Sequence, residues 1–439
     1  NITYKGVIAG LISGLLVTLY RLGIEFGTEK SIEAYKFLSL HPVYIFPWIL
    51  FILVAGFITY QLVKLEPYAQ GSGIPQVEGI VLFGMKMKWY TILIVRFLAG
   101  FLTSFFGVSL GREGPSIQIG AAGSQALAEK TGKNKLEENY LITAGASAGL
   151  SAAFNAPLSG ILFALEEVHR TFSPNILIAA TTAALTADLV SKSFFGLEPV
   201  LSYADIPQLP IRYYAWLLLL GILSGIVGAI TNKGLLGFGV IYERVSAFLR
   251  PVIALLIALP CGLLIPQVLG GGQNLIRLSE NAEIGISMLT VYLIAKLIFT
   301  CTSFGSGIPG GIFMPILSVG AIAGRIFGQA ITVFGISAEY IPAFCVCAMA
   351  GVMSGSVKAP VTSILLMAEM TGSLVHLLPV AAVAFIALLT SDILKISPIY
   401  EVLLEHITGG NTARINRKKA GAIIEMPVEP GSKIAGKRV

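Results

Sequence analysis

Long apolar stretches separated by short polar segments run through most of the chain. Ten of them can be marked, at about 5–26, 43–63, 90–110, 174–191, 214–232, 250–270, 286–301, 312–334, 340–357 and 374–394. Several approach the roughly 20 residues that a helix needs to cross a bilayer, and others are interrupted by glycine, proline or a charge. Only 12% of the 439 residues are charged, against about 25% in soluble domains. The pattern predicts an all-α membrane protein that crosses the bilayer several times.

Arg112 and Glu113 stand side by side within Gly111–Gly120, between two apolar runs. Ionisable groups at membrane depth are costly, so they usually face a cavity and carry a function. The flanking glycines allow a tight turn, and Pro115 suits the first turn of a new helix. Such a helix start points free N–H groups and a positive dipole end forward. The stretch predicts an anion site with a carboxylate beside it; a glycine-rich turn with a surface ion pair is the alternative.

A second stretch of the same kind comes earlier in the chain. Gly71-Ser72-Gly73-Ile74-Pro75 follows an apolar run that ends near Pro67. A loop before a helix start again offers backbone N–H groups to an anion, and Ser72 adds a hydroxyl donor. The serine could equally be only an N-cap, and these residues alone leave that alternative open.

Two adjacent carboxylates, Glu166 and Glu167, close an apolar helix that follows a run of small residues at 144–153. The small residues predict close helix contact inside the membrane. Paired carboxylates at a helix end can simply mark the water interface. Here, however, they stand at the negative end of the helix dipole, and this mismatch favours a specific role.

Motifs of the first half return in the second half. Gly111–Pro115 matches Gly311–Pro315 at an offset of 200, and Ala156-Pro157 matches Ala359-Pro360 at an offset of 203. Glu166 matches Glu369 at the latter offset. We therefore predict two transmembrane repeats. The residues themselves leave open whether the repeats are parallel or inverted.

The predicted organisation is a first repeat at 1–196, a proline-containing linker at 197–211 and a second repeat at 212–410. Broken helices at matching positions point to a transport site between the repeats near the bilayer midplane. Where the first copy has Arg112 and Glu113, the second has Ile312 and Phe313. The second loop therefore offers N–H groups and an apolar wall without a competing charge.

Charge and composition argue against several other classes. Seven of the 30 Lys and Arg residues follow residue 411, which predicts a cytoplasmic C-terminus. No aromatic residues are interleaved with them, so we expect no nucleic-acid partner. The four cysteines have no metal-binding spacing and the four histidines are scattered. We predict no metal, no cofactor and no enzymatic activity.

Together these motifs resemble the CLC family of chloride channels and proton-coupled chloride antiporters. The resemblance covers about residues 5–410, and it rests on three signatures in order, with Pro398–Tyr400 behind them: Gly71–Pro75, Gly111–Pro115 and Gly311–Pro315. It implies a CLC-type fold of about eighteen helices, many of them short, tilted or broken, in two halves of inverted topology. It also implies a homodimer with one pore per subunit, in the lipid bilayer of a prokaryotic plasma membrane.

The resemblance also assigns roles to residues. Ser72 and Tyr400 would bind the central anion with their hydroxyls, and Ile312 and Phe313 with their backbone N–H groups. Glu113 would be the gate and the external proton acceptor. This role agrees with the chemistry, because a charged carboxylate can occupy an anion position that a neutral one releases. The other anion-binding residues would be Gly73, Ile74, Gly111, Arg112 and Gly114.

Glu167 separates the two activities of the resembled family. Antiporter-like members use the second carboxylate of this pair to relay protons from the cytoplasmic side, and channel members commonly have an apolar residue. The glutamate here favours chloride/proton antiport, with a passive chloride channel of the same fold as the alternative. Ser72 favours chloride, with bromide next, over nitrate or fluoride, since nitrate-preferring relatives tend to have proline at this position.

The last segment, 411–439, begins with a basic stretch. Ile423–Lys433 resembles the opening strand and turn of the ligand-sensing domain that ends many prokaryotic potassium-uptake regulators, the TrkA C-terminal type. We expect the start of a truncated regulatory domain here, with a disordered basic tail as the alternative.

Overall fold

The structure is a computed structural model of the chain. It describes residues 2–201, 203, 206–280 and 284–409. The segment 411–439, where we predict a basic stretch and the start of a regulatory domain, lies outside the described residues. The described residues form 17 α-helices and no named β-strand, which confirms the all-α prediction and comes close to the eighteen helices expected.

The first half of the chain forms eight helices: α1 (Ile2–Leu40), α2 (Ile45–Leu65), α3 (Ile74–Phe83), α4 (Trp89–Ser104), α5 (Glu113–Thr131), α6 (Lys135–Phe154), α7 (Pro157–Phe163) and α8 (Pro174–Phe195). The second half forms nine: α9 (Tyr214–Glu243), α10 (Leu249–Leu264), α11 (Gln273–Ser279), α12 (Ile286–Gly305), α13 (Phe313–Ile331), α14 (Ile341–Val357), α15 (Pro360–Thr371), α16 (Leu377–Ile393) and α17 (Ile399–Ile407).

Each of the ten apolar runs coincides with all or part of one helix. Within the described residues, seven helical segments are long and apolar enough to cross a membrane, and α4, α10 and α16 are shorter apolar helices. The apolar runs 90–110 and 250–270 extend beyond their helices, which end at Ser104 and Leu264. After α4 the chain turns at Gly107, whose φ is 68°. After α10, Pro266 begins the short 3₁₀ helix η5 (Pro266–Val268).

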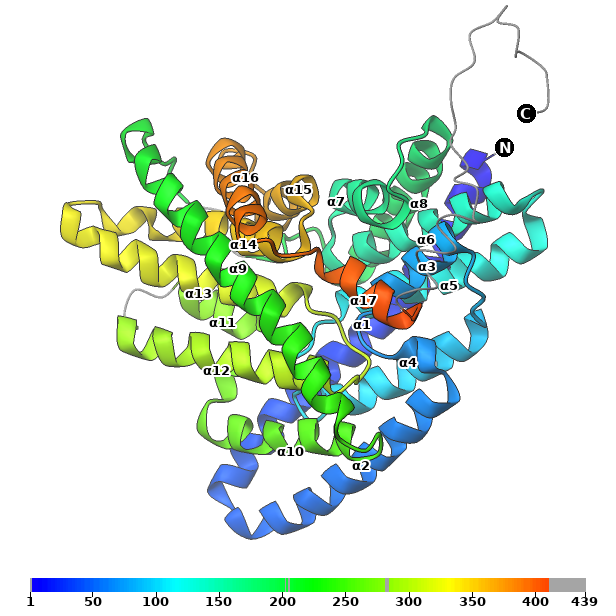
Figure 1. Ribbon diagram of the computed structural model, residues 1–439, viewed down its shortest axis with the longest axis horizontal. Coiled ribbons are helices and arrows are strands. Elements are labelled where there is room, and N and C mark those ends of the chain that lie inside the picture. Colours follow the sequence, from blue (N-terminus) through cyan, green and yellow to red (C-terminus); the bar gives the residue numbers. More distant parts are fainter. Residues whose placement is uncertain (1, 202, 204–205, 281–283, 410–439) are drawn as a thin grey trace, which may run out of the picture.

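The same packing pattern appears twice. In the first half α5 packs against α6, α6 against α8 and α8 against α1; in the second half α13 packs against α14, α14 against α16 and α16 against α9. Figure 1 shows the first half, blue to bluish green, beside the second half, green to orange. The last helix, α17, contacts α3 of the first half and α14 of the second.

The small residues of α6 allow α5 to pack closely against it, as the sequence predicts. An added Cβ on Gly149 would lie 2.3 Å from the Ser116 carbonyl oxygen on α5. No side chain fits at that distance, so the backbones of α5 and α6 are in direct contact. This contact holds α5 firmly, and α5 carries Glu113 at its first residue.

Two matching glutamates join the halves by reciprocal caps. The Glu369 carboxylate of α15 accepts hydrogen bonds from the backbone N–H of Leu158 (2.9 Å) and from the N–H and hydroxyl of Ser159 (2.7 and 2.5 Å), at the start of α7. The Glu166 carboxylate accepts the corresponding bonds from Val361 and Thr362 at the start of α15. Glu166 therefore does not simply mark a water interface, as its sequence position allowed.

Candidate functional site

The site forms where two helix starts meet. Gly111, before α5, donates its backbone N–H to the Gly311 carbonyl, and Gly311, before α13, donates to the Gly111 carbonyl, both at 2.7 Å. This antiparallel pair joins the equivalent residue of each copy. The first residues of the two helices, Glu113 and Phe313, follow within two positions, so two free helix N-termini open at the same place.

The Ser72 loop is the third part of the site. Gly73 has φ 95° and leads directly into α3. An added Cβ on Gly114 of α5 would lie 2.5 Å from the Ser72 Oγ and 3.2 Å from the Gly311 Cα. Only glycine fits between these groups. The predicted residues Ser72–Ile74, Gly111, Gly114 and Ile312–Phe313 are thus brought together from three segments far apart in the chain.

Aromatic rings form one wall of this place. The rings of Phe313 and Tyr400 lie nearly parallel, with centroids 6.1 Å apart and 16° between their planes. Phe163 meets Phe313 edge to face at 5.6 Å. Both Phe313 and Tyr400 are fully buried. Tyr400 thus joins the site from α17, although it is 87 residues beyond Phe313 in the chain.

Three buried polar atoms here have no hydrogen-bond partner among the described residues: the Ser72 Oγ, the Glu113 Oε2 and the Tyr400 hydroxyl. Ser72, Glu113 and Tyr400 are each at most 2% exposed. Buried polar groups are normally hydrogen-bonded, and an exception calls for an explanation. Two hydroxyl donors, free backbone N–H groups and an adjacent carboxylate make up a site suited to a small anion.

Two cavities approach the site. One, of about 460 Å³, is lined by Glu113, Arg112 and Glu25 among others; we call it the Glu113 cavity. The other, of about 530 Å³, is lined by Ser72, Gln76, Arg250 and His406 among others; we call it the Ser72 cavity. Glu113 and Gly111 line only the first cavity, and Ser72 lines only the second. We call the place where the Ser72, Gly111 and Gly311 loops meet the constriction.

The Arg112 side chain is engaged by an ion pair on α1. Its guanidinium lies 2.5 Å from the Glu25 carboxylate of α1, which also binds Arg21 at 3.1 Å. Arg112 is only 6% exposed. The two guanidiniums share one carboxylate, so the group keeps a positive charge, and the charge of Arg112 acts on the adjacent Glu113. Of the predicted anion-binding residues, Arg112 therefore contributes its backbone position beside Glu113, while its side chain stabilises the wall of the Glu113 cavity.

Two buried cations hold the loops, and sequence inspection missed both. Arg96 of α4 donates to the Gly71 carbonyl at 2.6 Å, and Lys296 of α12 donates to the Gly270 carbonyl at 2.7 Å. Both side chains are fully buried. Each stands 17 residues before a site helix (96 to 113 and 296 to 313). A lone cation at the matching position of two apolar runs was the signal that could have found them.

Glu167 lies apart from the constriction, on the π-helical turn η3 (Ala164–His169) that follows α7. It is 5% exposed, and its Oε2 has no hydrogen-bond partner among the described residues. The charged groups that act on it are Arg170, Glu78, Glu166 and Glu401. Glu167 is also within electrostatic reach of the Tyr400 hydroxyl, so a buried carboxylate stands close behind the aromatic wall.

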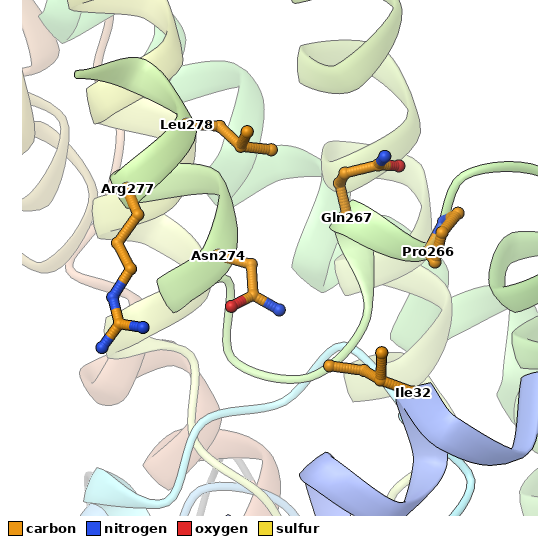
Figure 2. Close-up of a pocket in the computed structure, with 6 residues that line it drawn as sticks. All are labelled: Ile32, Pro266, Gln267, Asn274, Arg277 and Leu278. Atoms are coloured by element: carbon orange, nitrogen blue, oxygen red, sulfur yellow. The ribbon is translucent and has the colours of Figure 1, made fainter. Parts of the chain in front are cut away.

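A further cavity of about 410 Å³ adjoins the Glu113 cavity. Figure 2 shows its lining side chains, which come from α11, η5 and α1: Ile32, Pro266, Gln267, Asn274, Arg277 and Leu278. Ile32, Asn274 and Arg277 also line the Glu113 cavity. No predicted site residue borders this cavity, and we assign it no role in the chemistry.

Fold and site define an integral, multi-pass membrane protein with a small polar site between two cavities. The family model described as voltage gated chloride channel matches residues 50–392. The H(+)/Cl(-) exchange transporter ClcA of Salmonella agona is 32% identical over 418 residues, which cover 92% of this chain and 88% of that protein. The chain therefore belongs to the voltage gated chloride channel family, as its motifs indicated.

Solved structures agree with this assignment. The crystal structure of a slow cyanobacterial Cl-/H+ antiporter superimposes with a TM-score of 0.87 at 26% identity, covering 93% of this chain and 98% of that one. The crystal structure of a CLC-type fluoride/proton antiporter superimposes with a TM-score of 0.73, covering 89% and 95%. At 24% identity, the second likeness shows the fold alone. The CLC-type fold predicted from the motifs is confirmed.

Proposed function

We propose that the protein exchanges chloride for protons across a lipid bilayer. The 32% identical relative is named as an exchange transporter for these two ions, and the structural neighbour at 26% identity is described as an antiporter for them. The observation that carries the proposal is the constriction itself, where Ser72, Glu113 and Tyr400 place unpartnered polar atoms between two cavities. Ion exchange requires neither a metal nor a covalent intermediate.

Chloride sheds its water at the constriction and gains protein donors in exchange. The donors are the hydroxyls of Ser72 and Tyr400 and the backbone N–H groups of Ile312 and Phe313, at the positive end of the α13 dipole. Gly73, Ile74, Gly111 and Gly114 shape the loops that bring these donors together. Bromide is close to chloride in size and charge, so it is the expected second substrate.

Glu113 acts as the gate and takes up protons from the Glu113 cavity, which it lines. The backbone N–H groups of Glu113 itself and Met314 act on its carboxylate. When charged, the carboxylate competes with the anion for these donors. When protonated, it loses that attraction and leaves the position to chloride. One proton is thereby exchanged against anion binding.

Glu167 relays protons to Glu113 from the Ser72 side of the constriction. Its burial on η3, near Tyr400, supports a proton route that is separate from the anion path on the Ser72 side. A passive channel needs no such group. This position of Glu167 is what favours antiport over a channel of the same fold.

We also propose how the chain is oriented in the membrane and how it assembles. We assign the Ser72 cavity to the cytoplasmic side, because α17 lines it and leads to the basic residues after 411. The two repeats, 1–196 and 212–410, joined by 197–211, work as one pore. Two such chains form a homodimer in a prokaryotic plasma membrane, which chemical cross-linking in native membranes would test.

The deciding experiment uses purified protein in chloride-loaded liposomes with a potassium shunt and no initial pH gradient. An outward chloride gradient should alkalinise the external medium, and a protonophore should abolish this change. Glu167→Val should abolish proton movement and spare chloride flux. Chloride efflux at constant external pH in the unmodified protein would instead establish a passive channel. Competition with bromide, nitrate and fluoride in the same liposomes tests the anion preference.

A further inference from the structure

Arg170 binds carboxylates from two other parts of the chain. Its Nη2 lies 2.9 Å from the Glu78 Oε1 on α3, and its Nη1 lies 3.5 Å from the Glu401 Oε1 on α17. Its charge also acts on Glu167, three residues earlier. The guanidinium is therefore ion-paired with two carboxylates and lies within electrostatic reach of a third, so each of them feels a change in the charge of another.

Arg170 also has an unusual backbone conformation. It follows η3 with φ 55°, a left-handed conformation that residues other than glycine adopt uncommonly. The two ion-paired carboxylates differ in freedom, since Glu78 is 1% exposed and Glu401 is 33% exposed. Arg170 and Glu78 thus form a fixed pair, and Glu401 is the partner that can move away into solvent.

Glu401 is the residue next to Tyr400. Both lie in the first turn of α17, a helix of only nine residues. Any change in the Arg170–Glu401 ion pair is therefore transmitted to the residue whose hydroxyl faces the constriction.

We propose that Arg170 links the protonation of Glu167 to the position of Tyr400, an inference that rests on the proposed function of both residues. While Glu167 is charged, Arg170 is divided among three carboxylates and holds Glu401 weakly. When Glu167 takes a proton, Arg170 is left to Glu78 and Glu401, and it draws the first turn of α17 inward. Tyr400 then closes the Ser72 side of the anion path while a proton is on its way to Glu113.

Among the described residues, the titratable groups on the same turn as Glu167 are Glu166 and His169, and Tyr400 is within electrostatic reach of it. Glu166 is engaged at the start of α15 through Val361 and Thr362. His169, on the same turn, shares a hydrogen bond with the Thr143 hydroxyl on α6, and its ring lies 5.9 Å from that of Tyr140. Both groups have partners outside the Arg170 cluster. The three carboxylates around Arg170 are therefore the ones that compete for its charge.

The test follows the mobility of α17 directly. A nitroxide is attached at Leu403→Cys, a position of α17 that lines the Ser72 cavity, and its spectrum is recorded at pH 5 and pH 8, with the unmodified chain as the labelling background. We expect a mobile fraction larger at pH 8 by about fivefold, the lower end of ordinary coupling between sites. Glu401→Gln should be mobile at both pH values, and Glu167→Gln should be immobile at both.

A parallel measurement in liposomes tests how this link affects the ratio of chloride to protons exchanged. In liposomes, Glu401→Gln should raise the ratio of chloride to protons, because Tyr400 no longer closes when Glu167 is protonated. Glu405→Gln, which changes an exposed carboxylate on the same helix, should leave the ratio unchanged. Arg170→Lys keeps the charge but lacks the two separate N–H groups that bridge two carboxylates. Its ratio of chloride to protons should therefore lie between that of the unmodified protein and that of Glu401→Gln.

Two failures can be told apart. The link through Arg170 is overturned if the nitroxide still responds to pH in both Glu401→Gln and Glu167→Gln. It is also overturned if the nitroxide does not respond to pH when Glu167 and Glu401 are unchanged. A normal nitroxide response in a protein that moves chloride without protons overturns the antiport and leaves the link between Glu167 and α17 in place.

Discussion

Replacing Glu369 by glutamine should destabilise the protein although it changes one atom. The carboxylate accepts three hydrogen bonds, from the Leu158 N–H and from the N–H and hydroxyl of Ser159. The amide retains one oxygen, so it can keep the two bonds from Ser159 and must turn an NH₂ group towards the Leu158 N–H. It also gives up its charge at the positive end of α7.

The magnitude follows from these contacts. A hydrogen bond to a charged group contributes about 1.5–3 kcal/mol and a neutral one about 0.5–1.5 kcal/mol. One lost bond and two weakened bonds give about 3 kcal/mol, with the lost bond counted at the lower end because Leu158 is 53% exposed. The matching change, Glu166→Gln, should cost about 2 kcal/mol, since its bonds are longer at 3.3, 2.9 and 2.7 Å.

The assay is equilibrium unfolding in mixed micelles of increasing SDS content, followed by tryptophan fluorescence. Glu405→Gln is the matched control, because it makes the same chemical change on an exposed carboxylate. We expect the free energy of unfolding to be highest for the control, lower for Glu166→Gln and lowest for Glu369→Gln. A Glu369 variant within about 0.5 kcal/mol of the control, the usual range for surface substitutions, would refute the reciprocal caps as a source of stability.

Three further outcomes are expected. Glu113→Gln should pass chloride without proton coupling, because an amide cannot titrate; coupling that survives in liposomes would exclude Glu113 as the gate. Gly114→Ala should weaken chloride binding about tenfold by calorimetry, since its Cβ would lie 2.5 Å from the Ser72 Oγ and overpacking costs about 1–3 kcal/mol. Lys296→Met should lower the free energy of unfolding by about 2–4 kcal/mol, because two buried carbonyls lose a charged donor; no change in the SDS titration would contradict this.

Much of the fold could be predicted because apolar length and helix-start chemistry are local. The ten apolar runs each coincide with all or part of one helix, and Pro75, Pro115 and Pro315 all lie in the first turn of a helix. The repeat could be found because Gly311–Pro315 keeps the spacing of Gly111–Pro115. Apolar runs do not by themselves mark where a helix ends: α4 ends at Ser104 and α10 at Leu264, while the apolar sequence continues into the loops that follow.

The candidate site was harder to predict in full, because ion pairs join segments that are distant in the chain. Arg112 has the same local sequence signal as Glu113, yet its partner, Glu25, is 87 residues away. The Arg170 cluster draws on α3 and α17, so neither Glu78 nor Glu401 has a local signal. Arg96 and Lys296 show where the sequence could have been used better, since the repeat aligns them.

The mutual bond between Gly111 and Gly311 lies where a two-fold axis would pass between two identical half-length chains. Such an assembly would place the same residue after both glycines, and two carboxylates would then face a single anion across the axis. They would repel one another and leave the anion no favourable position. Joining the two halves in one polypeptide lets Arg112-Glu113 follow one glycine and Ile312-Phe313 the other. Joining the two halves in one chain therefore allows the site to have a single carboxylate, Glu113, beside each bound anion.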